Sequence, residues 1–348
     1  MTGERGVRGA RRIAAKLVAA LGTILFVLVL NFFLFRVLPG DPARAGLADP
    51  RLTEQSVALI RARYGLDKPV VNGIVSLHPL RFGAWTADPL DTQFARYFGN
   101  LARGELGISF HSNRPVRELL AERLGNTLLL LAGGQALALL IGLALGAFAA
   151  ARSGKPADRW TVLGGLAAWS VPSFWLAMIL LFLGGRLLGL PLGGRSTPGL
   201  DTNAWGHSLD IARHLVLPTL TLTIVYFGEY LLVSRSALVD VLGEDFVLVA
   251  RAKGLSPGQV LRRHALRVAA LPIVTLVALN LGLVVAGAIQ VEMVFSWPGL
   301  GLAMYEAVVQ RDYPVLQGVF LLLTLSVVLA NLLVELLYPK LDPRTARR

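Results

Sequence analysis

The sequence contains no cysteine and few charged side chains, and both shortages narrow the classes of protein that it can encode. Without cysteine, the chain forms no disulfide, no thiolate metal site and no cysteine nucleophile. Charged residues make up 16% of the 348 positions and hydrophobic residues 54%. Soluble domains average about 25% charged and about 45–50% apolar residues. The composition therefore favours a protein that is embedded in lipid.

Motifs that would indicate catalysis are also missing from the sequence. No Gly-x-x-x-x-Gly-Lys-Ser/Thr phosphate loop occurs, so we expect no ATP hydrolysis by this chain itself. His-Glu-x-x-His and Gly-x-Ser-x-Gly are absent as well, which leaves no support for a metalloprotease or an esterase. The five histidines are scattered: His78, His111, His207, His214 and His264. The sequence predicts no catalytic residue and no metal site.

Long apolar blocks dominate the chain instead. A bilayer core about 30 Å thick requires roughly 20 apolar residues in a helix. Six segments qualify, namely Leu17–Phe35, Leu124–Ala151, Trp160–Gly185, Leu215–Ser234, Val268–Val291 and Val315–Val334. A barrel strand needs only about 10 alternating residues, and these blocks are longer and more uniform. We therefore predict an all-α membrane protein with six transmembrane helices.

Basic residues set the expected orientation, because cytoplasmic loops of membrane proteins are enriched in Lys and Arg. More than half of the 34 basic residues lie in four segments that an inside N-terminus places in the cytoplasm: 1–16, 152–159, 235–267 and 339–348. The net charge of +12 then follows from membrane topology and requires no nucleic-acid partner. We expect both termini in the cytoplasm.

The predicted organisation follows from these blocks. It comprises a cytoplasmic N-terminus (1–16), a first helix (17–38), an extracytoplasmic segment (39–123), a five-helix core (124–338) and a cytoplasmic C-terminus (339–348). The core helices are expected at about 124–151, 160–185, 215–234, 268–292 and 315–338. Within the extracytoplasmic segment, Thr53–Tyr64 is expected to be helical, and the Trp85-to-Asp91 portion is expected to be loop.

The inner loop at residues 235–267 is long enough to be structured. Asp245–Lys253 has helical spacing and ends at Gly254, and glycine there can adopt the left-handed conformation that closes a helix. The Ser256–Gln259 sequence supplies an N-cap, a first-turn proline and a capping box for a second helix, Pro257–Arg267. Such an element either covers the helix bundle from below or docks a cytoplasmic partner. Its basic residues could also bind lipid headgroups.

The loop contains Gly243–Leu255 (GEDFVLVARAKGL), then Val260–Arg267 (VLRRHALR) and Leu271-Pro272. This pattern resembles the signature loop of ABC importer permeases, in particular the first membrane subunit of the dipeptide/oligopeptide/nickel type. Further matching strings follow in the family's order: Leu38–Pro42, Tyr64–Pro69, Gly104–Ser109, Ser170–Trp175, Val294–Gly301 and Arg311–Pro314. The chain departs from the pattern at Leu248, where importer loops generally carry an acidic residue, and in an insertion at Asn72–Thr92.

The resemblance implies a type I importer permease fold and a division of labour among subunits. This chain and a second homologous permease would line a path, and one or two cytoplasmic ATPase subunits would bind ATP and Mg²⁺. An extracytoplasmic binding protein would deliver the substrate, which we expect to be a peptide. The chain itself would bind no cofactor and would span the bacterial inner (plasma) membrane several times, in contact with lipid. ATPase coupling would fall on Ala250, Arg251, Ala252, Lys253, Gly254, Leu255 and Ser256.

Polar residues inside the apolar blocks are candidates for the translocation path or its gate, because a charge at the bilayer centre costs about 2.5–3.5 kcal/mol. The polar candidates are Glu229, Glu292, Asn280 and Gln290, and Pro172 is a further candidate because a kink in its helix could serve gating. For Glu292 a structural hydrogen bond near the membrane interface is an equal alternative. The amides can equally form hydrogen bonds between helices. Pro172 is expected to kink its helix, and Gly142 with Gly146 predicts the close approach of a second helix.

An ion-gradient-driven secondary carrier of small solutes is the alternative function. Such carriers are typically built from internal repeats with ionisable groups near the bilayer midplane, and the sequence shows neither a repeat nor a cluster of buried charges. An intramembrane enzyme would need a catalytic constellation that the sequence does not contain. A receptor-like scaffold would bind a partner without supporting flux. The sequence therefore favours the importer permease.

Overall fold

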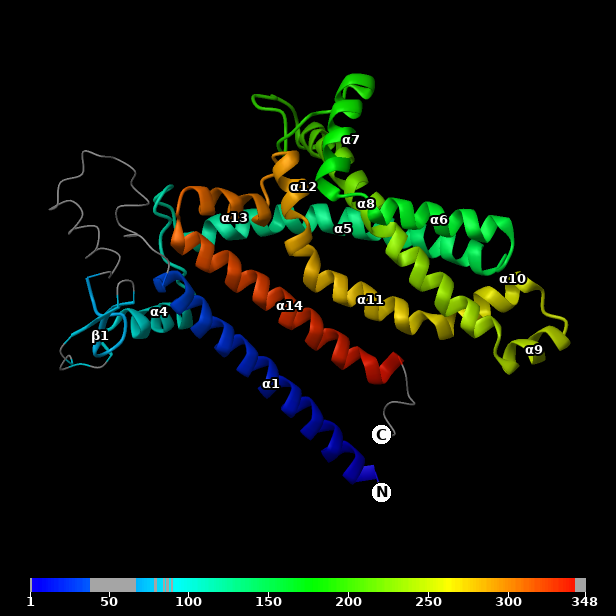
Figure 1. The fold of residues 1–348 in the computed structure, drawn as a ribbon, viewed down its shortest axis with the longest axis horizontal. Coiled ribbons are helices and arrows are strands. Elements are labelled where there is room, and N and C mark those ends of the chain that lie inside the picture. The colour runs from blue at the N-terminus through cyan, green and yellow to red at the C-terminus, as the bar shows by residue number, and fades with distance from the viewer. Residues whose placement is uncertain are drawn as a thin grey trace. The chain divides into compact units, whose positions relative to one another are not determined.

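The computed structural model describes the backbone of residues 2–37, 67–77, 80–83, 85, 88 and 90–341. The chain divides into two compact units, and Figure 1 labels their helices and strands. The first contains residues 1–125 and 299–328, and the second contains residues 126–298 and 329–348. The expected helix at Thr53–Tyr64 and the Leu38–Pro42 string lie outside the described residues.

The described part of the chain is almost entirely helical, as the apolar blocks predict. Its first half comprises α1 (Thr2–Val37), β1 (Ile74–Leu77), β2 (Leu80–Phe82), α4 (Gln93–Ala102), α5 (Val116–Ala150), α6 (Pro156–Ser170) and α7 (Ser173–Leu188). Its second half comprises α8 (Ala204–Leu242), α9 (Asp245–Ala252), α10 (Pro257–Val260), the π-helix η1 (Leu261–Ala265), α11 (Leu266–Gly287), α12 (Ile289–Val294), α13 (Leu300–Val309) and α14 (Tyr313–Leu341).

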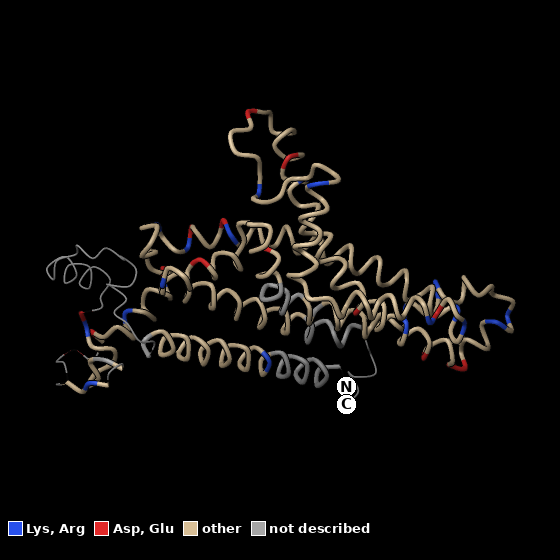
Figure 2. The backbone as a smooth tube through the Cα atoms, turned by 45° about the horizontal axis from the view of Figure 1, so that its top comes forward, with Lys and Arg blue, Asp and Glu red and all other residues tan. Residues whose placement is uncertain are grey.

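Four helices in the described part are long and apolar enough to cross a membrane, and a bent pair of helices makes a fifth candidate. The four are Ala14–Phe35 within α1, α5, α8 and Tyr313–Leu333 within α14. Lys, Arg, Asp and Glu are sparse along these helices and concentrate near the ends and in the connecting segments (Figure 2). The fifth expected block, Val268–Val291, falls on α11 and the short α12, with a turn at Ala288. Six spans therefore stay a prediction.

The third expected span is broken rather than kinked. Trp160–Gly185 was expected to form one helix bent at Pro172, but α6 ends at Ser170, α7 begins at Ser173, and the two are bent by 94°. Proline has no N–H to donate and disfavours the helical conformation in the residue before it. Val171 is accordingly extended, with φ −78° and ψ 128°. The expected kink is thus corrected to a complete interruption of the helix.

The Asn72–Thr92 insertion contains structure that the sequence did not predict. Strands β1 and β2 within it form a two-stranded antiparallel sheet, in which Leu77 pairs with Leu80. The Thr92 hydroxyl caps the following helix, α4, by accepting a hydrogen bond from the Ala95 N–H. Asp91 pairs with Lys68 and Arg96 at 2.7 and 2.9 Å. Hydrogen bonds from both cations lower the pKa of the Asp91 carboxyl.

Helix α8 forms the centre of the second unit, where α6, α7 and α11 pack against it. Glycines allow α5 to approach the same helix. A Cβ on Gly142 would lie 2.8 Å from the carbonyl oxygen of Phe227, and one on Gly146 would lie 2.9 Å from that of Leu231. Such distances leave no room for a side chain. The prediction that Gly142 and Gly146 accommodate a neighbouring helix is confirmed.

We expect Gly142→Ala to lower the melting temperature of the purified protein, because overpacking a tight contact costs about 1–3 kcal/mol. Gly164 in α6 is the matched control, since a Cβ there meets nothing within 4 Å. Gly164→Ala should leave the melting temperature unchanged or raise it slightly, because alanine is the better helix former. Equal melting temperatures for the two variants would contradict the close packing of α5 on α8.

Candidate functional site

The loop between α8 and α11 folds into a compact helical element. Helix α8 ends at Leu242, and α9 begins three residues later at Asp245, with Glu244 as its N-cap. Asp245 lies in the first turn of α9 and Arg251 in its last turn, where their charges complement the helix dipole. The predicted helix Asp245–Lys253 therefore forms with almost the expected bounds, and Lys253 is its C-cap.

A tight turn joins α9 to α10. Gly254 adopts φ +82°, the left-handed conformation that glycine accepts without steric cost. The Leu255 N–H donates to the carbonyl of Ala250 at 3.3 Å, which closes the helix end. Ser256 and Gln259 form both hydrogen bonds of a capping box at the start of α10. The local signals in the sequence thus give the turn that they predict.

The second helix of the loop differs from its expected form. Pro257–Arg267 was expected to be a separate short helix, but α10 ends at Val260 and continues through η1 directly into α11. The π-helical turn at Leu261–Ala265 inserts a residue into the helical repeat. No break separates the loop from the apolar helix, so α10, η1 and α11 form one continuous helical segment.

Three buried side chains hold the two short helices together. Val247 and Ala250 of α9 pack against Val260 of α10, with Leu242 and Leu255 partly buried around them. A second cluster joins η1 and α11 to α5 and α8. It contains Ala150, Ala237, Leu238, Ala265 and Ala269. The loop is therefore fixed to the helices beneath it and is not a free appendage.

The outer face of α9 is exposed and apolar. Leu248 is 62% exposed and Val249 54% exposed. Of the predicted coupling residues, Arg251, Ala252, Lys253, Gly254 and Ser256 are exposed on the same element. Ala250 instead points into the small core, and Leu255 is half-buried against it. The predicted residues thus divide into an outward-facing group and two that support the turn from inside.

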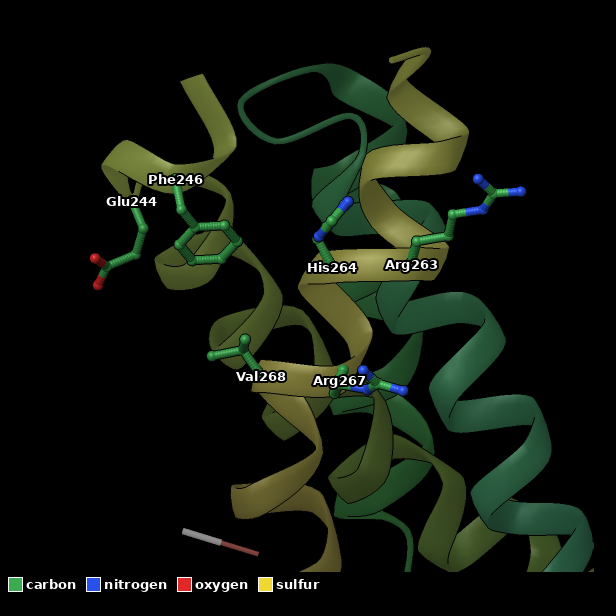
Figure 3. A pocket seen from close by; sticks show the side chains of 6 residues that line it. All are labelled: Glu244, Phe246, Arg263, His264, Arg267 and Val268. Atoms are coloured by element: carbon green, nitrogen blue, oxygen red, sulfur yellow. The ribbon is translucent and has the colours of Figure 1, made fainter. Parts of the chain in front are cut away.

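A pocket of about 330 Å³ lies beside α9, lined by Glu244, Phe246, Arg263, His264, Arg267 and Val268. Phe246 and Val268 face each other across it, whereas the Arg263 and Arg267 side chains extend away from the phenyl ring (Figure 3). The pocket therefore has apolar walls with a charged margin. It separates the first turn of α9 from the start of α11.

An ion pair that sequence reasoning missed lies close to the loop. The Arg235 guanidinium in α8 donates two hydrogen bonds to the Asp158 carboxylate in α6, at 2.6 and 2.7 Å. The Gly154 N–H donates a third at 3.0 Å, and Asp158 is only 2% exposed. The only sign of this ion pair in the sequence is that Asp158 is an acidic residue within the basic segment 152–159. That signal does not identify the partner 77 residues away.

Two predicted path residues meet inside the second unit. The Asn280 amide donates to the Glu229 carboxylate at 3.1 Å and to the Tyr230 hydroxyl at 3.3 Å. Tyr230 in turn donates to Gln135 at 2.7 Å. The network links α5, α8 and α11. Glu229 is half-buried, whereas Asn280 and Tyr230 are buried, so the carboxylate is the accessible end of the network.

The other predicted path residues lie elsewhere. Glu292 is completely buried and accepts a hydrogen bond of 2.7 Å from the Thr127 hydroxyl. Gln290 is exposed and accepts a hydrogen bond from the Ser173 hydroxyl. Ser173 directly follows Pro172, which is also exposed. Gln290 and Pro172 are thus neighbours at the break between α6 and α7. They are not part of the Glu229 network.

Two of the family-like strings meet within the first unit. The Asp312 carboxylate accepts hydrogen bonds from the Ser109 hydroxyl at 2.5 Å and from the Phe110 and His111 N–H groups at 3.1 and 3.2 Å. Ser109 and Asp312 are 1% and 2% exposed. The Gly104–Ser109 and Arg311–Pro314 strings therefore form one hydrogen-bonded structure, which accounts physically for their residue types.

Two family models match the chain. The model described as binding-protein-dependent transport system inner membrane component matches residues 142–347. The N-terminal model of the same membrane component matches residues 10–131. Because the first covers more than half of the chain, the chain belongs to this family of ABC importer permeases. It is a multi-pass protein of the bacterial plasma membrane, in a family that works with an ATPase and a substrate-binding protein.

Individual relatives and a solved structure agree with this assignment. The chain is 37% identical to the glutathione transport system permease protein GsiC of Salmonella paratyphi A, over 95% of this chain and 97% of that protein. It is 35% identical to the GsiC protein of Escherichia coli O6:H1, with the same coverage. The structure of the MetNI methionine ABC transporter matches with a TM-score of 0.52 and 18% identity, over 64% of this chain and 96% of that chain. That match supports the fold.

We expect Ala250→Leu to loosen the element formed by α9 and α10, because overpacking a small core costs about 1–3 kcal/mol. Amide hydrogen exchange in residues 245–260 should accelerate accordingly. Ala252→Leu is the matched control, since Ala252 is exposed on the same helix and should exchange as the wild type does. Equal exchange in the two variants would contradict the inward orientation of Ala250.

Proposed function

We propose that this chain is the first of two membrane subunits in an ATP-driven importer of peptides. The observation that carries the proposal is the end-to-end similarity to a glutathione permease, at 37% identity over 95% of the chain. Glutathione is a tripeptide, so a short peptide is the substrate class. A second homologous permease would complete the path, and an extracytoplasmic binding protein would deliver the peptide to it.

The topology that we propose has six spans with both termini in the cytoplasm. The basic residues of segments 1–16, 152–159, 235–267 and 339–348 support it, because positive charge is retained on the cytoplasmic side. Residues 39–123 then lie outside the membrane on the opposite side. ATP and Mg²⁺ would bind to one or two partner ATPase subunits, and this chain would hold no cofactor of its own.

The exposed face of α9 and its following turn would bind the ATPase. Leu248 and Val249 are large, exposed and apolar in a segment expected to face the cytoplasm. A protein partner that covers them removes apolar surface from water, at about 25 cal/mol per Å². Arg251 and Lys253 add positive charge on the same exposed helix and would orient the partner. The internal core and the capping box support this surface by limiting its motion.

Nucleotide-driven closure of the ATPases would displace α9, and the helices attached to it would follow. A nucleotide that binds the two states of the complex with different affinity shifts the population between them. Glu229, with Asn280 behind it, is our candidate for a contact with the peptide ammonium group. Glu292, Gln290 and Pro172 are the candidates for the gate. Glu292 accepts a hydrogen bond from Thr127, and Gln290 accepts one from Ser173, the residue after Pro172.

The test of this function is reconstitution of the chain with its sister permease, ATPases and binding protein in vesicles. We expect uptake of a short peptide such as glutathione that requires ATP and the binding protein. The permease pair without the ATPases should show none. Uptake by the chain alone, driven by an ion gradient, would overturn the proposal in favour of a secondary carrier.

We expect Gly254→Pro to abolish uptake while membrane insertion stays normal. Proline fixes φ near −65°, which is incompatible with the φ of +82° at Gly254, so the turn behind the ATPase-binding surface must rebuild. Gly189→Pro is the matched control. Gly189 is also a left-handed glycine that ends a helix, at φ +60°, and it lies far along the chain from this loop. Normal uptake by a correctly inserted Gly254→Pro variant would contradict the coupling role.

We expect Glu229→Gln to raise the KM for peptide uptake about tenfold, which corresponds to about 1.4 kcal/mol of lost charge–charge interaction. The glutamine still accepts a hydrogen bond from Asn280, so the network should persist and the ATPase rate should stay unchanged. Glu306→Gln is the control, because Glu306 pairs with Arg123 at 3.2 Å on other helices. An unchanged KM in Glu229→Gln would remove this residue from the path.

A further inference from the structure

The Asp158–Arg235 ion pair joins α6 to α8. It lies near the end of α8 that leads into the element formed by α9 and α10. Arg235 lies seven residues before the end of α8 at Leu242, and α9 begins at Asp245. Asp158 lies in the first turn of α6. The carboxylate accepts two hydrogen bonds from one guanidinium and a third from the Gly154 N–H. This bidentate geometry fixes both direction and distance between the helices.

The remaining contact between α6 and α8 includes a point where both helices carry glycine. A Cβ on Gly228 of α8 would overlap the carbonyl oxygen of Gly165 in α6. Such a contact brings two backbones together, with the Leu231 side chain of α8 against Gly165 and the Trp169 side chain of α6 against Gly228. Asp158 lies seven residues before Gly165, and Arg235 lies seven residues after Gly228. The ion pair is therefore about two helical turns from the glycine contact, and it holds the two helices together at a second point, nearer to α9.

Helix α6 is also the first part of the interrupted third span. Beyond the 94° bend, α7 packs against both α8 and α12. A movement of α8 that α6 follows would therefore carry the bent pair with it. If α6 slid instead, α8 and the α7 packed against it would move without α6, and the bend between α6 and α7 at Pro172 would have to change.

We propose that Asp158 and Arg235 are positioning residues that make α6 and α8 move as one body when the ATPase displaces α9. The proposal rests on the proposed importer function and adds a role that the ATPase-binding surface does not have. Asp158 is almost completely buried. Among the described residues, Arg235 is its only guanidinium partner. Separating a buried carboxylate from such a partner is strongly unfavourable. The pair therefore stays closed throughout the transport cycle.

The test compares transport with ATP hydrolysis in the full reconstituted complex. Asp158→Asn keeps the size of the side chain and an acceptor for Gly154 but removes the charge. We expect ATP hydrolysis within twofold of the wild-type rate and peptide uptake at least fivefold lower, so that more ATP is used per peptide. Arg159→Gln is the control on the neighbouring exposed residue and should leave this ratio unchanged. A parallel fall in both rates, or an unchanged ratio, in Asp158→Asn would overturn the proposal.

A second variant tests the closed state directly and does not depend on how well Asp158→Asn folds. The chain has no cysteine, so Asp158→Cys with Arg235→Cys introduces its only thiols. Before cross-linking, the double variant should show the raised ratio of ATP to peptide. A short bis-maleimide linker between the two thiols should restore the wild-type ratio. Loss of uptake on cross-linking would overturn the proposal, because it would mean that the pair must open. Failure of the wild-type complex to transport would instead count against the importer function.

Discussion

Hydrocarbon offers no water to backbone N–H and C=O groups, and this constraint determines the architecture of the chain. It accounts for helices as long as the 39 residues of α8. Both carboxylates among the path candidates accept hydrogen bonds, which lowers the cost of placing them among apolar helices. Glu292 accepts from Thr127, and Glu229 accepts from Asn280. At the interruption, the Val171 N–H donates to the Ala168 carbonyl and the Leu176 N–H donates to the Pro172 carbonyl, so part of the backbone freed by the break is still paired.

Features with short-range causes could be predicted from the sequence. The helix at α9, its closing glycine and the capping box at Ser256 depend on residues within four or five positions of one another, so their spacing is sufficient. The inward orientation of Ala250 could also have been read from its position three residues after Val247, which places both on one face. Four of the apolar blocks likewise coincide with helices long enough to span a membrane.

Features that depend on distant partners could not be predicted. Asp158 and Arg235 are 77 residues apart, and Ser109 and Asp312 are 203 apart. No local pattern specifies either pairing. The β1–β2 sheet was missed because its strands have only four and three residues, too few to show a clear alternation. At Pro172 the sequence indicates a disturbance, but the 94° bend depends on what α7 packs against.

Helix α9 has one side that maintains its own fold and another that meets the surroundings, and different residues serve each. Val247 and Ala250 face inward, whereas Leu248, Val249 and Arg251 face outward. If this outer side binds the ATPase as proposed, substitutions there would alter which motor protein is recognised without unfolding the element. A permease built in this way would then be open to re-pairing with a different ATPase by a handful of surface changes.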